Sequence, residues 1–485
     1  MPSLSFLSRS DGRVRAWRIG RGLLGSSLVI GIGLAIELGS QFARTFVLAR
    51  LLGAEEFGLV AAIMTLAAVV DMISFIGIDR FIVYSPAGGD PEALKAAHAL
   101  TWLRGIAAAA IVVALAVPTA DLLGVRAYAG SFAAVSLYPL LRAATHLGAT
   151  QWQRSGRFFP NTAAEAGGAV LGLVTAVVTA LTIPGHLDIV WALAAQSATS
   201  VLLSHLLARG VPYRIGFDRE RMREALRFGL PLLGNGLALA AVYQLDRMVV
   251  GAWLGVVAVG IYGLSMTLLL QPISLLLRLV TTALQPRLSE AWHSDRSGAF
   301  PRLVRELGRY IAAAGAAGAI VASCLGAPLL RLVFGPGYAA SDTFFVLLAA
   351  VAMLRFCRGA QGVLGLAIGR TPDLMVSNTA GAVALPVTIA AFYLDAAPES
   401  AAFGLCVGEL LSVAVADLRL RRYCGSADRA LIGNLAVAAV VPAALAVWVL
   451  FVEPTLPIRA MAAGLGLAAT ACLVLLVPRR SRDRP

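Results

Sequence analysis

Apolar stretches of about twenty residues follow one another along almost the whole chain, and only short polar connections separate them. A helix of that length matches the roughly 30 Å hydrocarbon core of a bilayer, and a spanning helix satisfies its own backbone hydrogen bonds. The alternation over about ten residues that is typical of membrane barrel strands does not occur in the sequence. The pattern therefore predicts an all-α polytopic membrane protein with about fourteen transmembrane helices. The predicted spans are 23–50, 57–83, 98–120, 127–150, 160–183, 187–207, 228–253, 257–286, 309–333, 342–367, 373–394, 399–417, 430–452 and 457–477.

Arginine is concentrated in every second connection between these spans. Several arginines fall within 154–157, 209–227 and 287–309, whereas 51–56, 182–186, 254–256 and 395–399 contain neither Arg nor Lys. Short loops rich in Lys and Arg stay on the cytoplasmic side of a membrane. We therefore expect both termini to be cytoplasmic.

The composition agrees with a membrane protein. The chain is 59% apolar and 14% charged, whereas soluble proteins average about 45–50% apolar and 25% charged residues. The mean hydropathy is +0.80. The net charge of +13 comes from arginines in loops and at the two ends, where cations set topology and meet anionic headgroups. This distribution favours a membrane role over nucleic-acid binding.

The sequence offers little for enzyme chemistry. Its five cysteines are scattered without metal-ligand spacing. Lys95 is the sole lysine, so the Gly-x-x-x-x-Gly-Lys loop of an ATP-driven pump cannot be formed. The first twenty residues are polar and Arg-rich, so we expect no cleavable signal peptide. We expect neither a catalytic residue nor a bound cofactor.

A short internal repeat divides the chain near its middle. The string LGAEEFG at 52–58 is matched 202 residues later by LGVVAVG at 254–260, and the same offset aligns MTL at 64–66 with MTL at 266–268. Repeats of this kind indicate a duplicated unit. Six spans per half return the chain to the cytoplasmic side, so both halves would have the same orientation in the membrane. The predicted divisions are a basic N-terminus (1–22), a six-helix lobe (23–207), a linker (208–227), a second six-helix lobe (228–425), and two further helices with a basic tail (426–485). A short amphipathic helix is expected near 219–228.

Three segments resemble one transporter family. These are LARLLGAEEFG at 48–58, YQLDRMVVG at 243–251 and SLLLRLVTTALQP at 274–286. They are similar to polysaccharide transporters, the O-antigen and exopolysaccharide flippases of the multidrug/oligosaccharidyl-lipid/polysaccharide exporter superfamily. The matching segments cover about a quarter of the chain, and the predicted helix layout covers all of it.

The resemblance implies a fold and a cargo. The fold would be two six-helix lobes forming a V that opens alternately to each side of the bacterial inner membrane. The cargo would be an undecaprenyl-diphosphate-linked oligosaccharide for surface polysaccharide. The implied partners are this lipid-linked glycan, membrane lipids and the polysaccharide polymerase machinery, and the implied oligomeric state is a monomer.

Charged residues within spans are the candidate functional residues, because an intramembrane charge costs about 2.5–3.5 kcal/mol on insertion scales. Arginine binds phosphate oxygens in pairs, so a diphosphate cargo favours arginines in the cavity. The predicted substrate contacts are Arg44, Arg247, Arg278, Arg355 and Gln41. The predicted carriers of a coupling H⁺ or Na⁺ are Glu37, Asp71, Glu165 and Glu409, and these carboxylates are equally suited to neutralising the arginines.

Other charges have simpler interpretations. Asp79-Arg80 and Asp246-Arg247 are adjacent pairs whose side chains diverge by about 100° on a helix, so each member is expected to pair with a neighbouring helix. Arg80, Arg104 and Arg142 lie near the predicted cytoplasmic ends of spans, where snorkelling to headgroups is the default. His146 is expected to be a packed polar group rather than a ligand.

Two other transport functions fit the same layout. A cation-coupled multidrug exporter would need an acidic, aromatic-lined cavity, whereas the spans here contain more Arg than acidic residues. The chain could also be a lipid II flippase, because such a flippase has a similar layout with fourteen helices. A membrane-embedded glycosyltransferase or ligase is disfavoured, because the predicted outer connections are too short to hold a catalytic loop.

Overall fold

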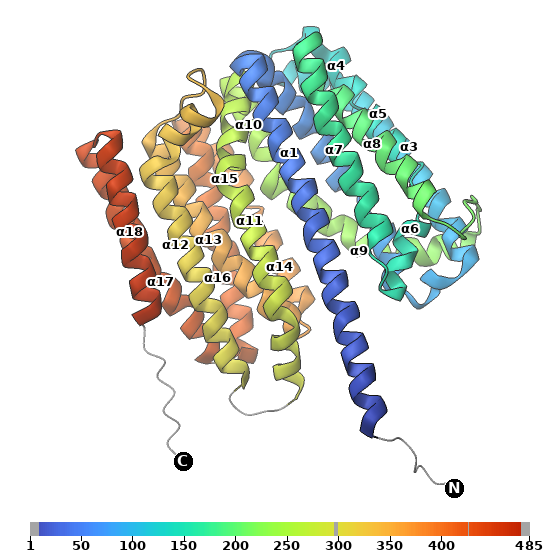
Figure 1. Cartoon of the computed structure of the whole chain (residues 1–485). Coiled ribbons are helices and arrows are strands. Elements are labelled where there is room, and N and C mark those ends of the chain that lie inside the picture. Colours follow the sequence, from blue (N-terminus) through green and yellow to red (C-terminus); the bar gives the residue numbers. More distant parts are fainter. Residues whose placement is uncertain (1–8, 295–298, 425, 477–485) are drawn as a thin grey trace. The chain divides into compact units, whose positions relative to one another are not determined.

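The computed structural model describes residues 9–294, 299–424 and 426–476, and within these ranges the regular structure is helical (Figure 1). In this part of the chain nine helices are long and apolar enough to cross a membrane, and three shorter apolar helices accompany them. The longest apolar helix, Leu28–Ile73, has 46 residues, enough at 1.5 Å per residue for two crossings. The protein is therefore an all-helical, multi-pass membrane protein, as the hydropathy pattern predicts.

The chain forms two compact units. The first comprises the described residues up to Leu52 together with Val70–Ala120 and Ala127–Gly234; the second comprises Gly53–Val69, Asp121–Arg126 and the described residues from Asn235 onward. The helices of the N-terminal half are α1 (Arg9–Ile73), α2 (Ile78–Tyr84), α3 (Pro91–Leu122), α4 (Ala129–Ala134), α5 (Leu137–Arg142), α6 (Gly148–Gln151), α7 (Phe159–Thr182), α8 (Asp188–Leu207) and α9 (Arg219–Tyr243), with 3-10 turns η1 (Pro86–Gly89), η2 (Arg126–Tyr128) and η3 (Trp152–Ser155). The remaining helices are α10 (Leu245–Leu254), α11 (Val256–His293), α12 (Ala299–Phe334), α13 (Asp342–Ala367), α14 (Thr371–Gly381), α15 (Ala384–Leu394), α16 (Pro398–Cys424), α17 (Ser426–Val452) and α18 (Leu456–Leu476).

The two copies of the sequence repeat share an unusual backbone conformation. Gly53 (φ 78°, ψ 176°) breaks α1, and Gly255 (φ 80°, ψ 176°) separates α10 from α11. A positive φ of this kind favours glycine. Within the second unit the next glycines of the two copies touch: a Cβ on Gly260 would lie 3.1 Å from the Cα of Gly58, and a Cβ on Gly58 would lie 2.4 Å from the carbonyl oxygen of Val256. The repeat is thus a structural feature as well as a sequence match.

Four of the predicted spans differ from continuous helices, and one of them, 57–83, is interrupted between the end of α1 at Ile73 and the start of α2 at Ile78. The stretch 127–150 is divided into α4, α5 and α6, and 3-10-type bonds such as Ser136 N–H to the Ala133 carbonyl lie at the breaks. The stretch 373–394 is broken between α14 and α15, shortly before Pro386, and α9 ends at Tyr243, before α10. Proline has no N–H to continue the helical ladder, and Pro139 lies within α5. The short helix expected near 219–228 is the start of α9.

Small residues let α7 and α8 pack closely in the first unit (Figure 1). α7 buries Ala164, Gly168, Gly172, Ala176 and Ala180, which recur every fourth residue and so form one stripe. Small residues are typical of close helix contacts in membranes, where apolar surface gains little by leaving lipid. This packing fixes the rotation of α7.

The start of the linker is held to the first unit by histidines. The ring of His98 accepts a hydrogen bond from the Leu147 N–H at 3.1 Å and lies 3.0 Å from the Arg214 carbonyl. The ring of His146 accepts from the Gly148 N–H at 2.9 Å and lies 3.1 Å from the Val211 carbonyl. In each ring one nitrogen is thus an acceptor and the other a donor, which is the neutral form. His146 is a packed polar group, as expected from the sequence.

Tyr213 lies among these imidazoles. Its ring centroid is 4.5 Å from that of His98, 5.3 Å from His146 and 4.7 Å from His205. Its hydroxyl accepts a 2.8 Å hydrogen bond from the indole N–H of Trp102. Burial raises the pKa of Tyr213 above its ordinary value of 10.0, so the phenol is protonated near neutral pH.

The last two helices are docked on the second unit. Ile320 and Cys324 of α12 form a buried apolar cluster with Val449 of α17 and Ala463 of α18. On α18, Arg459 makes a bidentate ion pair of 2.7 and 2.8 Å with Asp342 at the start of α13. Planar, bidentate pairs of this kind fix orientation as well as contributing energy.

Candidate functional site

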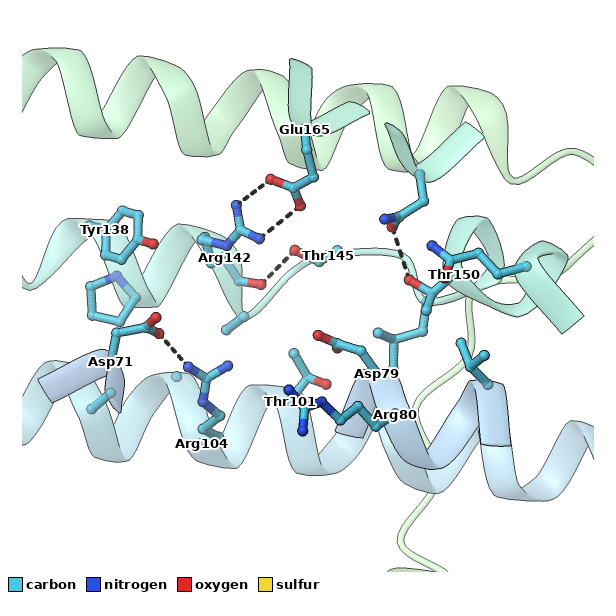
Figure 2. A pocket seen from close by; sticks show the side chains of 18 of the residues that line it. Asp71, Asp79, Arg80, Thr101, Arg104, Tyr138, Arg142, Thr145, Thr150 and Glu165 are labelled. Atoms are coloured by element: carbon cyan, nitrogen blue, oxygen red, sulfur yellow. Dashed lines mark hydrogen bonds and ion pairs between the residues drawn. The ribbon is translucent and has the colours of Figure 1, made fainter. Parts of the chain in front are cut away.

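A polar cavity of about 280 Å³ lies within the first unit (Figure 2). Three guanidinium groups and three carboxylates line it, from α1, α2, α3, α5 and α7: Arg80, Arg104, Arg142, Asp71, Asp79 and Glu165. Hydroxyl and amide groups complete the polar lining: Thr101, Tyr138, Thr145, Thr150, Gln153 and Asn161. Ionisable groups within membrane helices are expensive, so they mark functional sites. The cavity is therefore the candidate functional site of this unit.

Two ion pairs cross the cavity between helices. Both terminal nitrogens of Arg142 on α5 donate to the carboxylate of Glu165 on α7, at 3.0 and 2.8 Å. The guanidinium of Arg104 on α3 pairs with Asp71 near the end of α1 and also donates to the Ser74 carbonyl at 3.0 Å. The four side chains are 28–47% exposed. Solvent therefore reaches both pairs, and each still has donors and acceptors free for a ligand.

The remaining two charges are arranged differently. Asp79 lies at the start of α2, and Figure 2 shows its carboxylate directed into the cavity without a bond to a neighbouring side chain. In the part of the chain that the structure describes, Asp79 makes no hydrogen bond or ion pair, and its strongest Coulombic neighbours are Arg142 and Arg104. The guanidinium of Arg80 lies 5.4 Å from the ring centroid of Phe75. The expected pairing of Asp79 with a neighbouring helix is therefore wrong.

Close packing of α3 against α5 brings the two arginines to the same cavity. A Cβ on Gly105 would lie 2.5 Å from the Cβ of Ala143 and 2.8 Å from the Pro139 carbonyl oxygen, so a larger residue would separate these helices. Beyond the cavity, one nitrogen of Arg154 donates to the carbonyls of Ile82, Val83 and Ser85 at 2.9, 3.1 and 2.6 Å. A cation at the end of α2 satisfies carbonyls that the helix leaves unpaired.

Arg80, Arg104 and Arg142 therefore do not behave as the sequence suggests. They were expected to snorkel toward headgroups, but the structure places them around a cavity, and two of them pair with carboxylates of other helices. Counting residues along a span gives the depth of a side chain in the membrane, but it does not give the face of the helix on which that side chain lies. The sequence does contain one indication of these pairs, because neighbouring spans carry as many acidic residues as arginines.

A second charged cluster lies within the second unit. Glu409 on α16 is 1% exposed and forms ion pairs with Arg355 at 2.8 Å and Arg358 at 3.0 Å, both on α13. Arg355 also lies 4.8 Å from the ring centroid of Tyr243, and Arg358 donates to the hydroxyl of that tyrosine. Arg358 further donates to the amide oxygen of Asn378 at 3.4 Å. With two guanidinium groups to one carboxylate, this cluster carries a net positive charge.

Arg44 and Gln41 do not line the cavity of the first unit. Arg44 is 5% exposed, and its guanidinium donates to Gln196 of α8 at 2.6 Å. In the described ranges Arg44 forms no ion pair. Gln41 donates to Glu37 one turn earlier on α1, at 3.3 Å.

The other predicted contacts are on α10 and α11. The partly buried Arg247 follows Asp246, whose carboxylate accepts from the hydroxyl of Tyr262 at 2.7 Å and from the backbone N–H of Arg247 at 2.9 Å. The Asp246 carboxylate thus has hydrogen bonds where an ion pair was expected. Arg278 lies in α11, but its side chain is outside the part of the structure that is described. In the described ranges no cluster of three His, Cys, Asp or Glu residues could hold a metal ion.

The sequence profile of a polysaccharide biosynthesis protein family matches residues 47–342, more than half of the chain. The chain belongs to this family. Two curated relatives match part of the chain. The amylovoran biosynthesis protein AmsL of Erwinia amylovora is 25% identical over 202 residues, which are 40% of this chain and 50% of AmsL. The succinoglycan biosynthesis transport protein ExoT of Rhizobium meliloti is 27% identical over 264 residues, 53% of this chain and 51% of ExoT.

The matches therefore span about half the length of these curated relatives. Solved structures extend the likeness to the whole fold of this family member. The lipid II flippase MurJ in an inward closed conformation has a TM-score of 0.68 at 12% identity, over 92% of this chain and 98% of that chain. An inward-facing multidrug resistance MATE family transporter of the MOP superfamily has a TM-score of 0.64 at 14% identity, over 83% and 99%. The protein is thus an all-helical, multi-pass member of the polysaccharide biosynthesis family whose fold is similar to those of MurJ and the MATE transporters.

Proposed function

We propose that this protein is a flippase that moves a lipid-linked oligosaccharide, carried on undecaprenyl diphosphate, across the bacterial inner membrane for surface polysaccharide synthesis. The observation that carries the proposal is the charged cavity of the first unit in a member of a polysaccharide biosynthesis family. The proposal includes fourteen spans, two six-helix lobes that alternate in access, and cytoplasmic termini. The positive-inside pattern of the loops supports this topology.

The chemistry of the cavity suits a glycan joined to phosphate. Ion-paired Arg142 uses two of its five N–H donors on Glu165, and the rest remain for sugar or phosphate oxygens. The carboxylates and the hydroxyls of Thr101 and Tyr138 supply acceptors and donors for sugar hydroxyls. A fork-shaped guanidinium binds phosphate oxygens in pairs, and Arg80 has no carboxylate partner in the described part of the chain.

The residues predicted from the sequence as substrate contacts remain part of the proposal. Arg355 belongs to a cluster of net positive charge, which suits a diphosphate. Arg44 is buried and donates to Gln196 without a carboxylate partner in the described ranges, so its positive charge is not neutralised there by an ion pair. We propose that Arg247, Arg278 and Gln41 also contact the cargo. We further propose that the polysaccharide polymerase machinery is a partner of this protein.

The energy source is proposed to be a proton or sodium gradient. Of the four predicted carriers, Asp71, Glu165 and Glu409 are bound to arginines, and Glu37 contacts Gln41. A carboxylate that is paired with arginine keeps its negative charge. Charge neutralisation is therefore the role we assign to the three paired residues.

The test is deletion of the gene in its host, with mass spectrometry of lipid-linked glycans and measurement of surface polysaccharide. Accumulation of a complete lipid-linked repeat unit and loss of surface glycan are expected. Complementation with Arg104→Ala or Arg142→Ala should fail although the variants insert into the membrane, as should Arg44→Ala, Arg247→Ala, Arg278→Ala and Arg355→Ala. The matched control is Arg126→Ala, because the side chain of Arg126 is 76% exposed outside the cavity.

Two outcomes would refute the proposal. One is unchanged surface glycan in the deletion strain together with sensitivity to cationic drugs, which would indicate the multidrug exporter. The other is normal export by the cavity variants. Accumulation of the peptidoglycan precursor instead of a surface-polysaccharide unit would indicate the lipid II flippase.

A further inference from the structure

Asp79 differs from every other carboxylate of the cavity in the first unit. Asp71 and Glu165 each have a guanidinium partner. Asp79 is directed into the same space (Figure 2) and has no hydrogen-bond or ion-pair partner among the described residues. The nearby guanidinium groups of Arg104 and Arg142 donate to Asp71 and Glu165 and not to Asp79.

The difference decides which carboxylate can take up a proton. Protonating Glu165 would weaken both of its charge-assisted hydrogen bonds with Arg142, because the negative charge that makes such bonds about twice as strong as neutral ones is lost. Protonating Asp79 breaks no bond in the described structure. Asp79 is therefore the carboxylate of the cavity that a proton reaches at the lowest energetic cost.

We propose that Asp79 is the proton-accepting group of the cavity, and that its protonation converts a charge-balanced cavity into a positively charged one that admits an anionic headgroup. This inference rests on the proposed function, because it concerns how the same cavity receives a phosphate-bearing cargo. The proton comes from water and is held on a carboxylate oxygen of Asp79.

The charge balance follows from the groups that face Asp79. They lie on five of the helices around the cavity: Asp71 on α1, Arg80 and Tyr84 on α2, Arg104 on α3, Tyr138 and Arg142 on α5, and Glu165 on α7. With Asp79 ionised, three carboxylates balance three guanidinium groups; with Asp79 protonated, one positive charge remains. Tyr138 is neutral in both states. A doubly charged diphosphate ester is repelled less, and held better, in the second state.

The experiment uses the full chain purified in detergent and dimethyl diphosphate as the probe, because its esterified phosphates do not titrate near neutral pH. Calorimetric titrations in buffers of different ionisation enthalpy count the protons taken up per bound anion. We expect uptake approaching one proton in the wild type. Above the titration range of Asp79, affinity should fall about tenfold for each pH unit, which is the slope for one linked proton.

Two variants separate this role from a general change in charge. Asp79→Asn and Asp71→Asn each remove one negative charge from the same cavity. Asp79→Asn should bind the probe without proton uptake and without the pH slope, whereas Asp71→Asn should keep the uptake, displaced to lower pH by the freed Arg104. Asp79→Glu should restore the uptake that Asp79→Asn abolishes.

The proposal is overturned if the wild type binds the probe without proton uptake, if it fails to bind at acidic pH, or if sodium replaces the proton in the linkage. It is also overturned if Asp79→Asn retains the uptake. The wild-type measurement alone decides the matter should Asp79→Asn fail to fold. Normal glycan export by Arg104→Ala and Arg142→Ala would instead refute the proposed function, so the two failures are distinguishable.

Discussion

Replacing Gly58 by alanine tests the contact between the two copies of the repeat. The added Cβ would lie 2.4 Å from the carbonyl oxygen of Val256, 2.7 Å from its carbon and 3.0 Å from the nitrogen of Val257. All three atoms belong to the backbone turn at the start of α11, so no side-chain rotation can relieve the clash. The turn would have to move by about 0.6 Å merely to reach 3.0 Å from the oxygen.

The expected destabilisation follows from two opposing effects. Overpacking of this kind typically costs about 1–3 kcal/mol, and alanine gains about 0.5–1 kcal/mol over glycine within a helix. Gly58→Ala should therefore lower the free energy of unfolding by about 1–2 kcal/mol. The matched control is Gly39→Ala on the same helix, where a Cβ meets nothing within 4 Å; this variant should be as stable as the wild type or more so.

The assay is denaturant unfolding of both variants in detergent, followed by helical circular dichroism. Gly263→Ala provides a second control in α11, close to the contact, because a Cβ there also meets nothing within 4 Å. Equal stability of Gly58→Ala and the two controls would refute the claim that the repeat glycines are held in backbone contact.

Three further predictions concern other contacts. Glu409→Gln leaves two mostly buried arginines without their carboxylate and should destabilise the protein by about 3–5 kcal/mol; thermal unfolding at the wild-type temperature would contradict this. Arg459→Gln should speed hydrogen exchange in the helix that carries it, because the bidentate pair with α13 is lost; unchanged exchange would show that apolar packing alone holds the helix. Acidification below about pH 6.5, the ordinary pKa of histidine, should speed exchange at the amides of Val211, Tyr213 and Arg214, because a second proton on His98 or His146 would face a backbone N–H. When the segment 211–214 is released, the two histidines bind more protons, so its contact with them weakens as pH falls below about 6.5 and is fully present above that pH. Exchange rates that do not depend on pH after correction for intrinsic exchange would contradict this.

The hydropathy of the chain is enough to predict helices and their approximate positions, because the bilayer imposes both length and apolar composition. It does not locate the break between α5 and α6 or that between α14 and α15. The sequence runs across these breaks as AATH at 143–146 and AGAV at 380–383, without a Gly-Pro or Asn-Gly pair that would mark a turn. The glycine at 53 was visible as a turn residue, and its positive φ agrees.

The charged residues could be recognised from the sequence, but their partners could not. Glu165 and Arg142 lie on different helices, and their pairing depends on how far α5 and α7 are rotated. Rotation is set by packing, such as the small-residue stripe of α7. Asp79 and Asp246 illustrate the limit: both are followed by arginine, but one lacks a partner in the described structure and the other accepts from Tyr262.

The contact between Gly58 and Gly260 also limits how the two halves of the duplicated chain can change. A Cβ on Gly260 would meet the backbone of Gly58, and a Cβ on Gly58 would meet the turn that precedes Gly260. Neither copy can therefore acquire a larger residue at this position while the other copy keeps its path. At this position each copy acts as a steric template for the other.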